Sequence, residues 1–261
     1  MEKNQHIKPP VIQIRRLRKV YRLEEESVVA LHSISADIRK GEICCIFGTS
    51  GSGKSTLLNQ LAGMEKPTSG SVRIGRTDIT KLNERDMVTF RRKHIGFIFQ
   101  AYNLLPGLTA LENVALPMMF RGYPKKERNR KAVELLKKVG LEKRIYHYPA
   151  QMSGGQQQRV GIARAFVTKP EVVFADEPTG NLDTKTTAQI MGMITEMARE
   201  NQQTIVLVTH DPHMASYADR IITLIDGEIV RDEKNTPAQD TPDCSSVREE
   251  IQDSGKEMQK K

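Results

Sequence analysis

The stretch ICCIFGTSGSGKSTLLNQL, residues 43–61, decides the fold of this chain. Its apolar start, Ile43–Phe47, predicts a buried β-strand, and the residues from Lys54 through Leu61 predict a helix. Between them, Gly48–Thr56 fits the pattern G-x-x-x-x-G-K-[ST], whose glycines let backbone N–H groups turn inward around phosphate groups without a Cβ in the way. The stretch therefore predicts an α/β fold with a phosphate-binding loop.

Side chains of this loop add contacts to phosphate and to a metal ion. The ammonium of Lys54 can reach the β- and γ-phosphates of a nucleotide, and the hydroxyl of Ser55 can coordinate Mg²⁺. The helix that follows directs its positive end at the same anion. We therefore predict that a nucleotide and Mg²⁺ are bound by Gly48, Thr49, Ser50, Gly51, Ser52, Gly53, Lys54, Ser55 and Thr56.

Two carboxylates follow a second apolar run, Val172–Ala175, which predicts another strand. In phosphoryl-transfer sites an aspartate at a strand end holds the Mg²⁺ shell, and a second group positions the attacking water. We therefore assign Asp176 to the metal and Glu177 to the water as general base. The simpler alternative is a solvated pair of acids at the end of a strand.

His210 follows a third apolar run, Thr204–Val208. In a parallel sheet the C-terminal end of this strand lies at the same edge as the phosphate loop, so His210 could donate a hydrogen bond to the γ-phosphate. A metal site formed by His210 and His213 is the alternative, but it lacks a third ligand.

The rest of the chain divides by pattern. Strands are also predicted at Val11–Ile14, Ile34–Ile38, Ser71–Ile74, Ile95–Phe99 and Ile221–Leu224, and Asp226-Gly227 predicts a hairpin turn. Residues 101–158 instead indicate helices, one with Ala132, Leu135, Leu136 and Val139 on one face. We expect a flexible lead at residues 1–10, one domain at 11–231 made of a core (11–100 and 159–231) and a helical subdomain (101–158), and a disordered polar tail at 232–261.

Composition limits the class of protein. The 261 residues are 38% hydrophobic and carry a net charge of +8. The sequence has no run of about 18 apolar residues and no apolar segment of a secretory signal, which favours a cytoplasmic location. The three cysteines show no disulfide spacing, and Cys44 and Cys45 fit a buried strand. Clustered Lys and Arg could meet nucleic acid or an anionic membrane, although a solvated surface is the simpler explanation.

A second glycine motif identifies a family. Residues 148–159, YPAQMSGGQQQR, resemble the ABC signature LSGGQ, with Met152 where leucine is usual. Ser153 and the N–H groups of Gly154 and Gly155 cap the start of a predicted helix, so Ser153, Gly154, Gly155 and Gln156 could hold an anion. The resemblance implies an ABC ATPase fold with a mixed, mainly parallel sheet, an antiparallel β part and an inserted helical subdomain. It also implies a homodimer in which each ATP lies between one chain's phosphate loop and the other chain's signature.

Other positions match the same family in order. Tyr21 resembles the aromatic residue that stacks on adenine, a contact that needs the ring and not the hydroxyl; a tyrosine of the core or of a sheet edge is the alternative. Gln100 resembles the glutamine that contacts Mg²⁺ and couples to the membrane partner. Residues 181–183 resemble the loop through which the two chains sense each other, and His210 the switch histidine.

A finer resemblance is to the ATPases of macrolide exporters, lipoprotein-releasing complexes and the related cell-division pair. It is carried by residues 99–106, 108–114 and 175–183. It implies a membrane permease on another chain and a peripheral position of this chain on the inner face of the membrane. The permease would dock near Leu104 and Leu105. Packing of these leucines inside the helical subdomain is the alternative. A regulatory ATPase that moves no substrate is the other function considered. A soluble ABC ATPase acting on nucleic acid would carry tandem units or long insertions, which this sequence lacks, so we expect no specific nucleic-acid partner.

Overall fold

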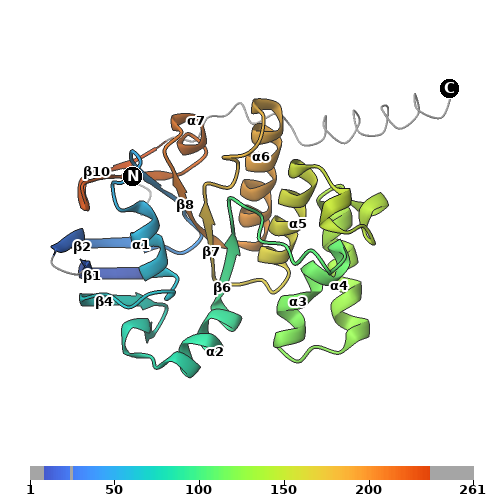
Figure 1. The fold of residues 1–261 in the computed structure, drawn as a ribbon, viewed down its shortest axis with the longest axis horizontal. Helices are drawn as coiled ribbons and strands as arrows, with labels where there is room; N and C mark the ends of the chain where they lie inside the picture. Colours follow the sequence, from blue (N-terminus) through green and yellow to red (C-terminus); the bar gives the residue numbers. More distant parts are fainter. Residues whose placement is uncertain (1–8, 24–25, 236–261) are drawn as a thin grey trace, which may run out of the picture.

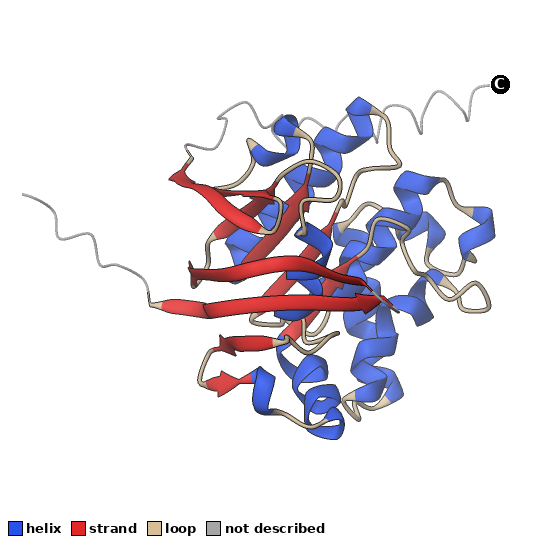
Figure 2. Cartoon of the chain, turned by 60° about the vertical axis from the view of Figure 1, so that its left-hand side comes forward, coloured by secondary structure: helices blue, strands red, loops and turns tan. Residues whose placement is uncertain are grey.

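The structure is a computed structural model that describes residues 9–23 and 26–235. Most of the predicted lead, the tail beyond residue 235 and Cys244 lie outside the described residues. Within the described part, one sheet has six strands and a second sheet has four. The strands gather on one side of the molecule and the helical subdomain lies on the other (Figures 1 and 2).

The larger sheet carries the strands predicted around the phosphate loop. Its central strands pair in parallel, and only the β9–β10 hairpin at one edge is antiparallel, so the sheet is mixed and mainly parallel as expected. Across the sheet the strands are β10 (Glu228–Lys234), β9 (Arg220–Ile225), β3 (Ile43–Phe47), β8 (Thr204–Thr209), β7 (Val172–Asp176) and β6 (Ile95–Ile98).

The smaller sheet is antiparallel, and two of its strands are much longer than the apolar runs that predicted them. Both β1 and β2 have 14 residues, because backbone pairing continues past the apolar segments into polar ones. Across this sheet the strands are β2 (Glu26–Arg39), β1 (Pro10–Leu23), β4 (Ser69–Ile74) and β5 (Thr77–Asp78).

Side chains of the central strands alternate between two cores because successive residues of a strand face opposite sides. Cys44 and Phe174 belong to the core between the two sheets, which also contains the buried leucines of the helix after the phosphate loop. Cys45 and Ala175 face the other core, which is covered by helices that lie between residues 110 and 215. Both cysteines are fully buried, as the sequence predicted.

The helices begin at residues that the sequence marks as caps. Thr109 and Ser153 each form a capping box with a Glu or Gln three residues later, and the Asp183 carboxylate accepts from the N–H of Thr186. The helices are α1 (Lys54–Leu61), α2 (Glu84–His94), α3 (Ala110–Phe120), α4 (Lys125–Lys138), α5 (Gly154–Phe166), α6 (Thr184–Asn201) and α7 (Pro212–Ala215), with short 3-10 helices η1 (Ile79–Lys81), η2 (Glu142–Arg144) and η3 (Pro149–Gln151). No helix in the described residues is both long and apolar enough to cross a bilayer.

One predicted boundary is wrong. Strand β10 continues to Lys234, three residues into the segment 232–261 that composition assigned to a disordered tail. The physical reason is Asp232, whose two carboxylate oxygens each accept a hydrogen bond from Arg220 of β9 at 2.6 Å. A charged segment that would bury little surface by itself is therefore ordered by pairing with its neighbour.

Candidate functional site

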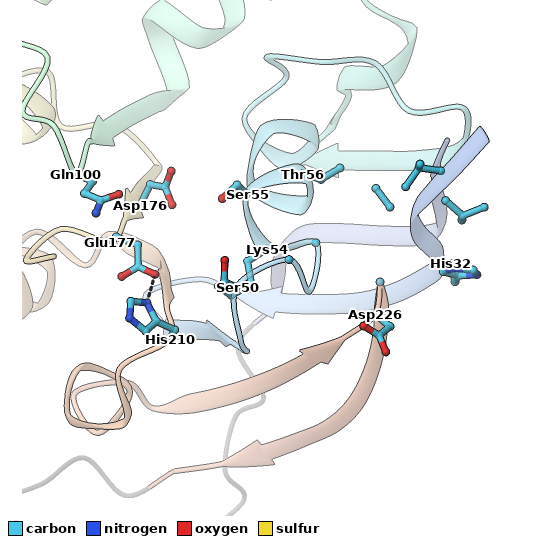
Figure 3. Close-up of a pocket in the computed structure, with 16 residues that line it drawn as sticks. His32, Ser50, Lys54, Ser55, Thr56, Gln100, Asp176, Glu177, His210 and Asp226 are labelled. Carbon is cyan, nitrogen blue, oxygen red and sulfur yellow. Dashed lines mark hydrogen bonds and ion pairs between the residues drawn. The ribbon is translucent and has the colours of Figure 1, made fainter. Parts of the chain in front are cut away.

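A cavity of about 630 Å³ opens at the C-terminal edge of the parallel strands. In Figure 3, Lys54 and Ser55 lie between two groups of side chains: Gln100, Asp176, Glu177 and His210 on one side, His32 and Asp226 on the other. The lining residues come from β2, the phosphate loop, α1, the ends of β6, β7 and β8, and the β9–β10 turn. They are Val28, Val29, Ala30, His32, Ser50, Gly51, Gly53, Lys54, Ser55, Thr56, Gln100, Asp176, Glu177, His210, Asp226 and Gly227.

The phosphate loop has the close backbone packing that glycine permits. Gly53 has φ 97°, and a Cβ at this residue would lie 2.7 Å from the carbonyl oxygen of Ala30. A Cβ on Gly48 would lie 2.3 Å from the carbonyl oxygen of Leu224. The loop therefore cannot accept larger residues at these positions, and its N–H groups and the start of α1 can surround an anion.

Lys54 is the buried cation of this loop, with 7% of its surface exposed. Its Nζ donates to the carbonyl oxygen of Thr49 at 2.6 Å, which ties the ammonium back to the loop. Thr49, Gly48 and Ser52 were predicted to contact the nucleotide but do not line the cavity.

Glu177 stands at the end of β7 in a conformation that non-glycine residues rarely adopt, with φ 44°. Its N–H donates to Val208 O at 3.0 Å, which attaches it to the neighbouring strand β8. Its Oε1 lies 2.6 Å from Nδ1 of His210. Its Oε2 is buried and has no hydrogen-bond partner among the described residues, and Glu177 as a residue lines the cavity.

The hydrogen bond between Glu177 and His210 joins two residues to which the sequence gave separate roles. The Glu177 side chain is 14% exposed and the His210 side chain 65% exposed, so the histidine forms the outer member of the pair. His213 donates its backbone N–H to Asp211 and its ring packs edge-on against Tyr217. The two histidines therefore have different surroundings.

Oxygen ligands suited to Mg²⁺ lie at the same edge. Asp176, Ser55 and Gln100 all line the cavity and offer a carboxylate, a hydroxyl and an amide oxygen, the hard donors that Mg²⁺ prefers. Burial raises the pKa of the Asp176 carboxyl above its ordinary value, and the charge of Glu177 raises it further, while Lys54 opposes both. A divalent cation would relieve this clustering of negative charge, so the residues present fit the metal.

Gln100 is given room by a glycine. A Cβ on Gly180 would lie 2.8 Å from Nε2 of Gln100, and Asn181 Nδ2 donates to the backbone carbonyl of Gln100 at 3.2 Å. The segment 181–183 therefore contacts the residue that the sequence assigned to Mg²⁺.

Tyr21 does not line the cavity, but two of its neighbours do. It lies directly opposite Val28 in the β1–β2 register, and its hydroxyl interacts with the hydroxyl of Thr56. Burial raises the pKa of the Tyr21 phenol, as does its hydrogen bond to Glu65 at 2.8 Å. Tyr21 thus stands beside the cavity at the end formed by β2 and α1.

The signature residues are not part of this cavity. Ser153 caps α5: its Oγ accepts from the Gln156 N–H at 3.3 Å, and the Gln156 side chain accepts from the Ser153 N–H at 3.1 Å. The helix begins at Gly154, directly after Ser153. None of Ser153, Gly154, Gly155 and Gln156 lines the cavity, so the chain carries a phosphate loop and a separate helix N-terminus.

Sequence reasoning missed the wall formed by β2 and the β9–β10 turn. Asp226-Gly227 was recognised only as a hairpin, yet Gly227 N–H donates to Ser52 O at 3.0 Å and so braces the phosphate loop. His32 N–H donates in turn to Gly227 O at 2.8 Å. Nothing in the local pattern links these segments, because they meet only in the folded chain.

Known proteins share this fold and these motifs. Residues 31–180 match the sequence model of the ABC transporter family, described as "ABC transporter". The chain is 46% identical to an uncharacterized ABC transporter ATP-binding protein, YvrO of Bacillus subtilis, over 86% of this chain and 97% of that protein. It is also 46% identical to the macrolide export ATP-binding/permease protein MacB of Escherichia coli (strain K12), over 88% of this chain but only 35% of MacB.

A solved structure agrees with the sequence relatives. The dimeric post-hydrolysis state of the ATP-binding cassette MJ0796, bound to ADP and Pi, superimposes with a TM-score of 0.81. It is 43% identical in sequence and covers 86% of this chain and 99% of its own. Fold, motifs and relatives agree, and we conclude that the chain belongs to the ABC transporter family as an ATP-binding and ATP-hydrolysing domain.

Proposed function

We propose that the chain hydrolyses ATP in the cavity beside the phosphate loop, with Glu177 as general base. The supporting observation is that Glu177 lines the cavity at the end of β7 and that its carboxylate is hydrogen-bonded to His210. This carboxylate accepts the proton of the attacking water. His210 orients the carboxylate through Nδ1, and the N–H at its other ring nitrogen donates a hydrogen bond to the γ-phosphate.

The remaining residues bind and orient the nucleotide. Lys54 and the loop N–H groups hold the phosphates, and Tyr21 stacks on the base beside Val28 and Thr56. Ser55, Asp176 and Gln100 hold Mg²⁺, which when bound neutralises the charge that develops on the phosphate oxygens.

The separation of the signature from the cavity supports a head-to-tail homodimer. Ser153–Gln156 presents the positive end of α5, yet none of these residues lines the cavity of its own chain. In the proposed dimer this helix end contacts the γ-phosphate held by the partner's loop. The MJ0796 cassette with ADP and Pi is itself dimeric.

A membrane permease is the proposed partner outside the dimer. MacB joins an ATP-binding part and a permease in one protein, and this chain spans 35% of it. We propose that the corresponding permease is a separate chain, that the complex exports its substrate, and that the ATPase is peripheral on the cytoplasmic face of the membrane. Leu105, with 47% of its surface exposed, is a suitable docking residue.

Glu177→Gln tests the catalytic proposal against Lys54→Ala. The first variant keeps an almost identical shape but cannot accept a proton, so ATP hydrolysis should fall by about 10²–10⁴-fold while MgATP still binds. On size-exclusion chromatography with MgATP it should elute as a dimer, whereas Lys54→Ala, which loses the cation for the phosphates, should remain a monomer. Hydrolysis by Glu177→Gln at the wild-type rate would move the base elsewhere, with His210 the next candidate.

A further inference from the structure

A cluster of polar side chains holds the phenol of Tyr21. The Tyr21 hydroxyl donates to Oε2 of Glu65 at 2.8 Å, and the same oxygen lies 3.2 Å from Nζ of Lys19. Asn59 Nδ2 donates to the other oxygen of Glu65 at 3.4 Å. Lys19 also donates to the carbonyl oxygen of Lys66 at 2.9 Å, so the cluster is attached to both β1 and the segment after α1.

Lys19 also contacts the ring of Tyr21. Its Nζ lies 5.0 Å from the ring centroid, within cation–π range, and the Lys19 side chain is only 15% exposed. One face of the Tyr21 ring is thus occupied by a cation of the same chain. Stacking of a planar ligand would therefore use the opposite face of the ring.

Glu65 remains an anion in this cluster. Burial acts to raise the pKa of its carboxyl, but the hydrogen bonds from Tyr21 and Lys19 outweigh burial, and the pKa lies below its ordinary value. The acceptor for the Tyr21 hydroxyl is therefore charged at neutral pH, and a charge-assisted hydrogen bond fixes the ring more strongly than a neutral one.

We propose that Glu65, supported by Lys19 and Asn59, is a positioning residue for the nucleotide base: it fixes the Tyr21 ring at the angle that stacking requires. This inference rests on the proposed role of Tyr21 as the stacking residue. It changes one expectation from the sequence, because a ring that is held through its hydroxyl is not replaced without loss by phenylalanine.

The test compares a ligand that has a base with one that lacks it. Binding of MgATP and of inorganic tripolyphosphate with Mg²⁺ is measured by titration calorimetry on the full chain. Glu65→Gln should weaken MgATP binding by about three- to thirtyfold, within the usual range for coupled contacts, and leave tripolyphosphate binding unchanged. Glu142→Gln, a change at an exposed acid of η2, is the matched control and should alter neither.

A double-variant cycle isolates the contact. Tyr21→Phe should lose at least as much MgATP affinity as Glu65→Gln, because it removes the hydrogen bond, whereas the glutamine keeps a neutral acceptor; the double variant should lose no more than Tyr21→Phe alone. Wild-type affinity in Glu65→Gln, together with a loss in Tyr21→Ala, would overturn the positioning role and leave stacking intact. Equal weakening of MgATP and tripolyphosphate by Glu65→Gln would show a general disturbance of α1 and also overturn it. No effect of Tyr21→Ala on MgATP would instead refute the stacking proposal itself.

Discussion

At the scale of single residues, the site depends on backbone conformations that most side chains avoid. Gly53, directly before α1, has φ 97°, and Glu177, directly after β7, has φ 44°. Neighbouring strands hold both: Ala30 of β2 lies against Gly53, and Val208 of β8 accepts from the Glu177 N–H. Strain of this kind persists where surrounding contacts over-determine the geometry.

Gly53→Ala should therefore destabilise the domain and abolish nucleotide binding. The left-handed backbone costs alanine roughly 1–2 kcal/mol, and the added Cβ would also lie 2.7 Å from Ala30 O. Gly122→Ala is the matched control, since Gly122 has φ 78° and a Cβ added there would have no atom within 4 Å. For Gly122→Ala, thermal melting and ATP binding should show only the cost of the left-handed backbone. If both variants lost the same stability and the same ATP affinity, the contact between residue 53 and β2 would be unimportant.

Asp176→Asn should raise the thermal stability of the nucleotide-free protein at neutral pH. Burial and Glu177 raise the pKa of Asp176 in the folded state above its unfolded value, so the charged form costs stability above that folded pKa. Below the unfolded pKa both states are protonated, and the advantage of the variant should vanish. Melting curves between neutral pH and about pH 3 check this; a variant less stable than wild type at neutral pH would contradict it.

At the scale of elements, α5 is the part that we propose to contact the second chain. Its N-terminus is held by a capping box between Ser153 and Gln156, so the helix end is formed within a single chain. A preformed helix end loses little conformational entropy when a second chain brings a phosphate to it.

Ser153→Arg added to Glu177→Gln should prevent the ATP-dependent dimer. The bulky side chain replaces the cap at the point where the partner's phosphate would approach, while the chain's own phosphate loop is untouched. Size-exclusion chromatography with MgATP should show a monomer, and MgATP should still bind that monomer. A dimer that persists would place the contact between chains elsewhere.

The loop between β6 and α3 combines a buried support with an exposed apolar residue. Asn113 is fully buried and donates to the carbonyl oxygens of Leu105, Leu108 and Thr109 at 3.1, 3.0 and 3.1 Å. Leu104 packs against the helical core, whereas Leu105 is 47% exposed. The two leucines, which the sequence treats alike, therefore have different surroundings.

Leu105→Asp should leave the fold and nucleotide binding intact but reduce co-purification with the permease from native membranes. Leu104→Asp should instead lower the melting temperature, since it places a charge against apolar neighbours. A well-folded Leu105→Asp protein that still recovers its permease fully would rule out docking at this residue.

At the scale of the whole molecule, the phosphate loop is held between two sheets. Strand β2 contributes Ala30 against Gly53 and Gly227, and the β9–β10 turn bonds the loop through Gly227. Strand β10 is in turn attached to β9 by Arg220, whose guanidinium also donates to Asp37 O of β2 at 2.6 Å. Strand β10 is therefore linked to the phosphate loop through its contacts with β9 and β2.

Two truncations separate the domain from the residues beyond it. Removing 236–261 should leave the melting temperature and ATPase activity unchanged, because that segment is polar and charged. Removing 232–261 should cost about 1–2 kcal/mol through loss of the Arg220–Asp232 hydrogen bonds, a drop of roughly 2–8 °C for a domain of this size. Equal melting temperatures would show that the end of β10 adds no stability.

The sequence by itself determined the phosphate loop, the strand-end carboxylates, the signature and the family, because each is a local pattern in which neighbouring residues perform the chemistry together. Tertiary structure decided what lies between distant segments. Glu177 meets His210 across 33 positions, and Tyr21 meets Glu65 across 44. The end of β10 was likewise fixed by a partner on another strand. Periodicity and motifs describe one segment at a time, whereas the angle of a catalytic carboxylate or an aromatic ring is set by whichever segment the folded chain brings against it.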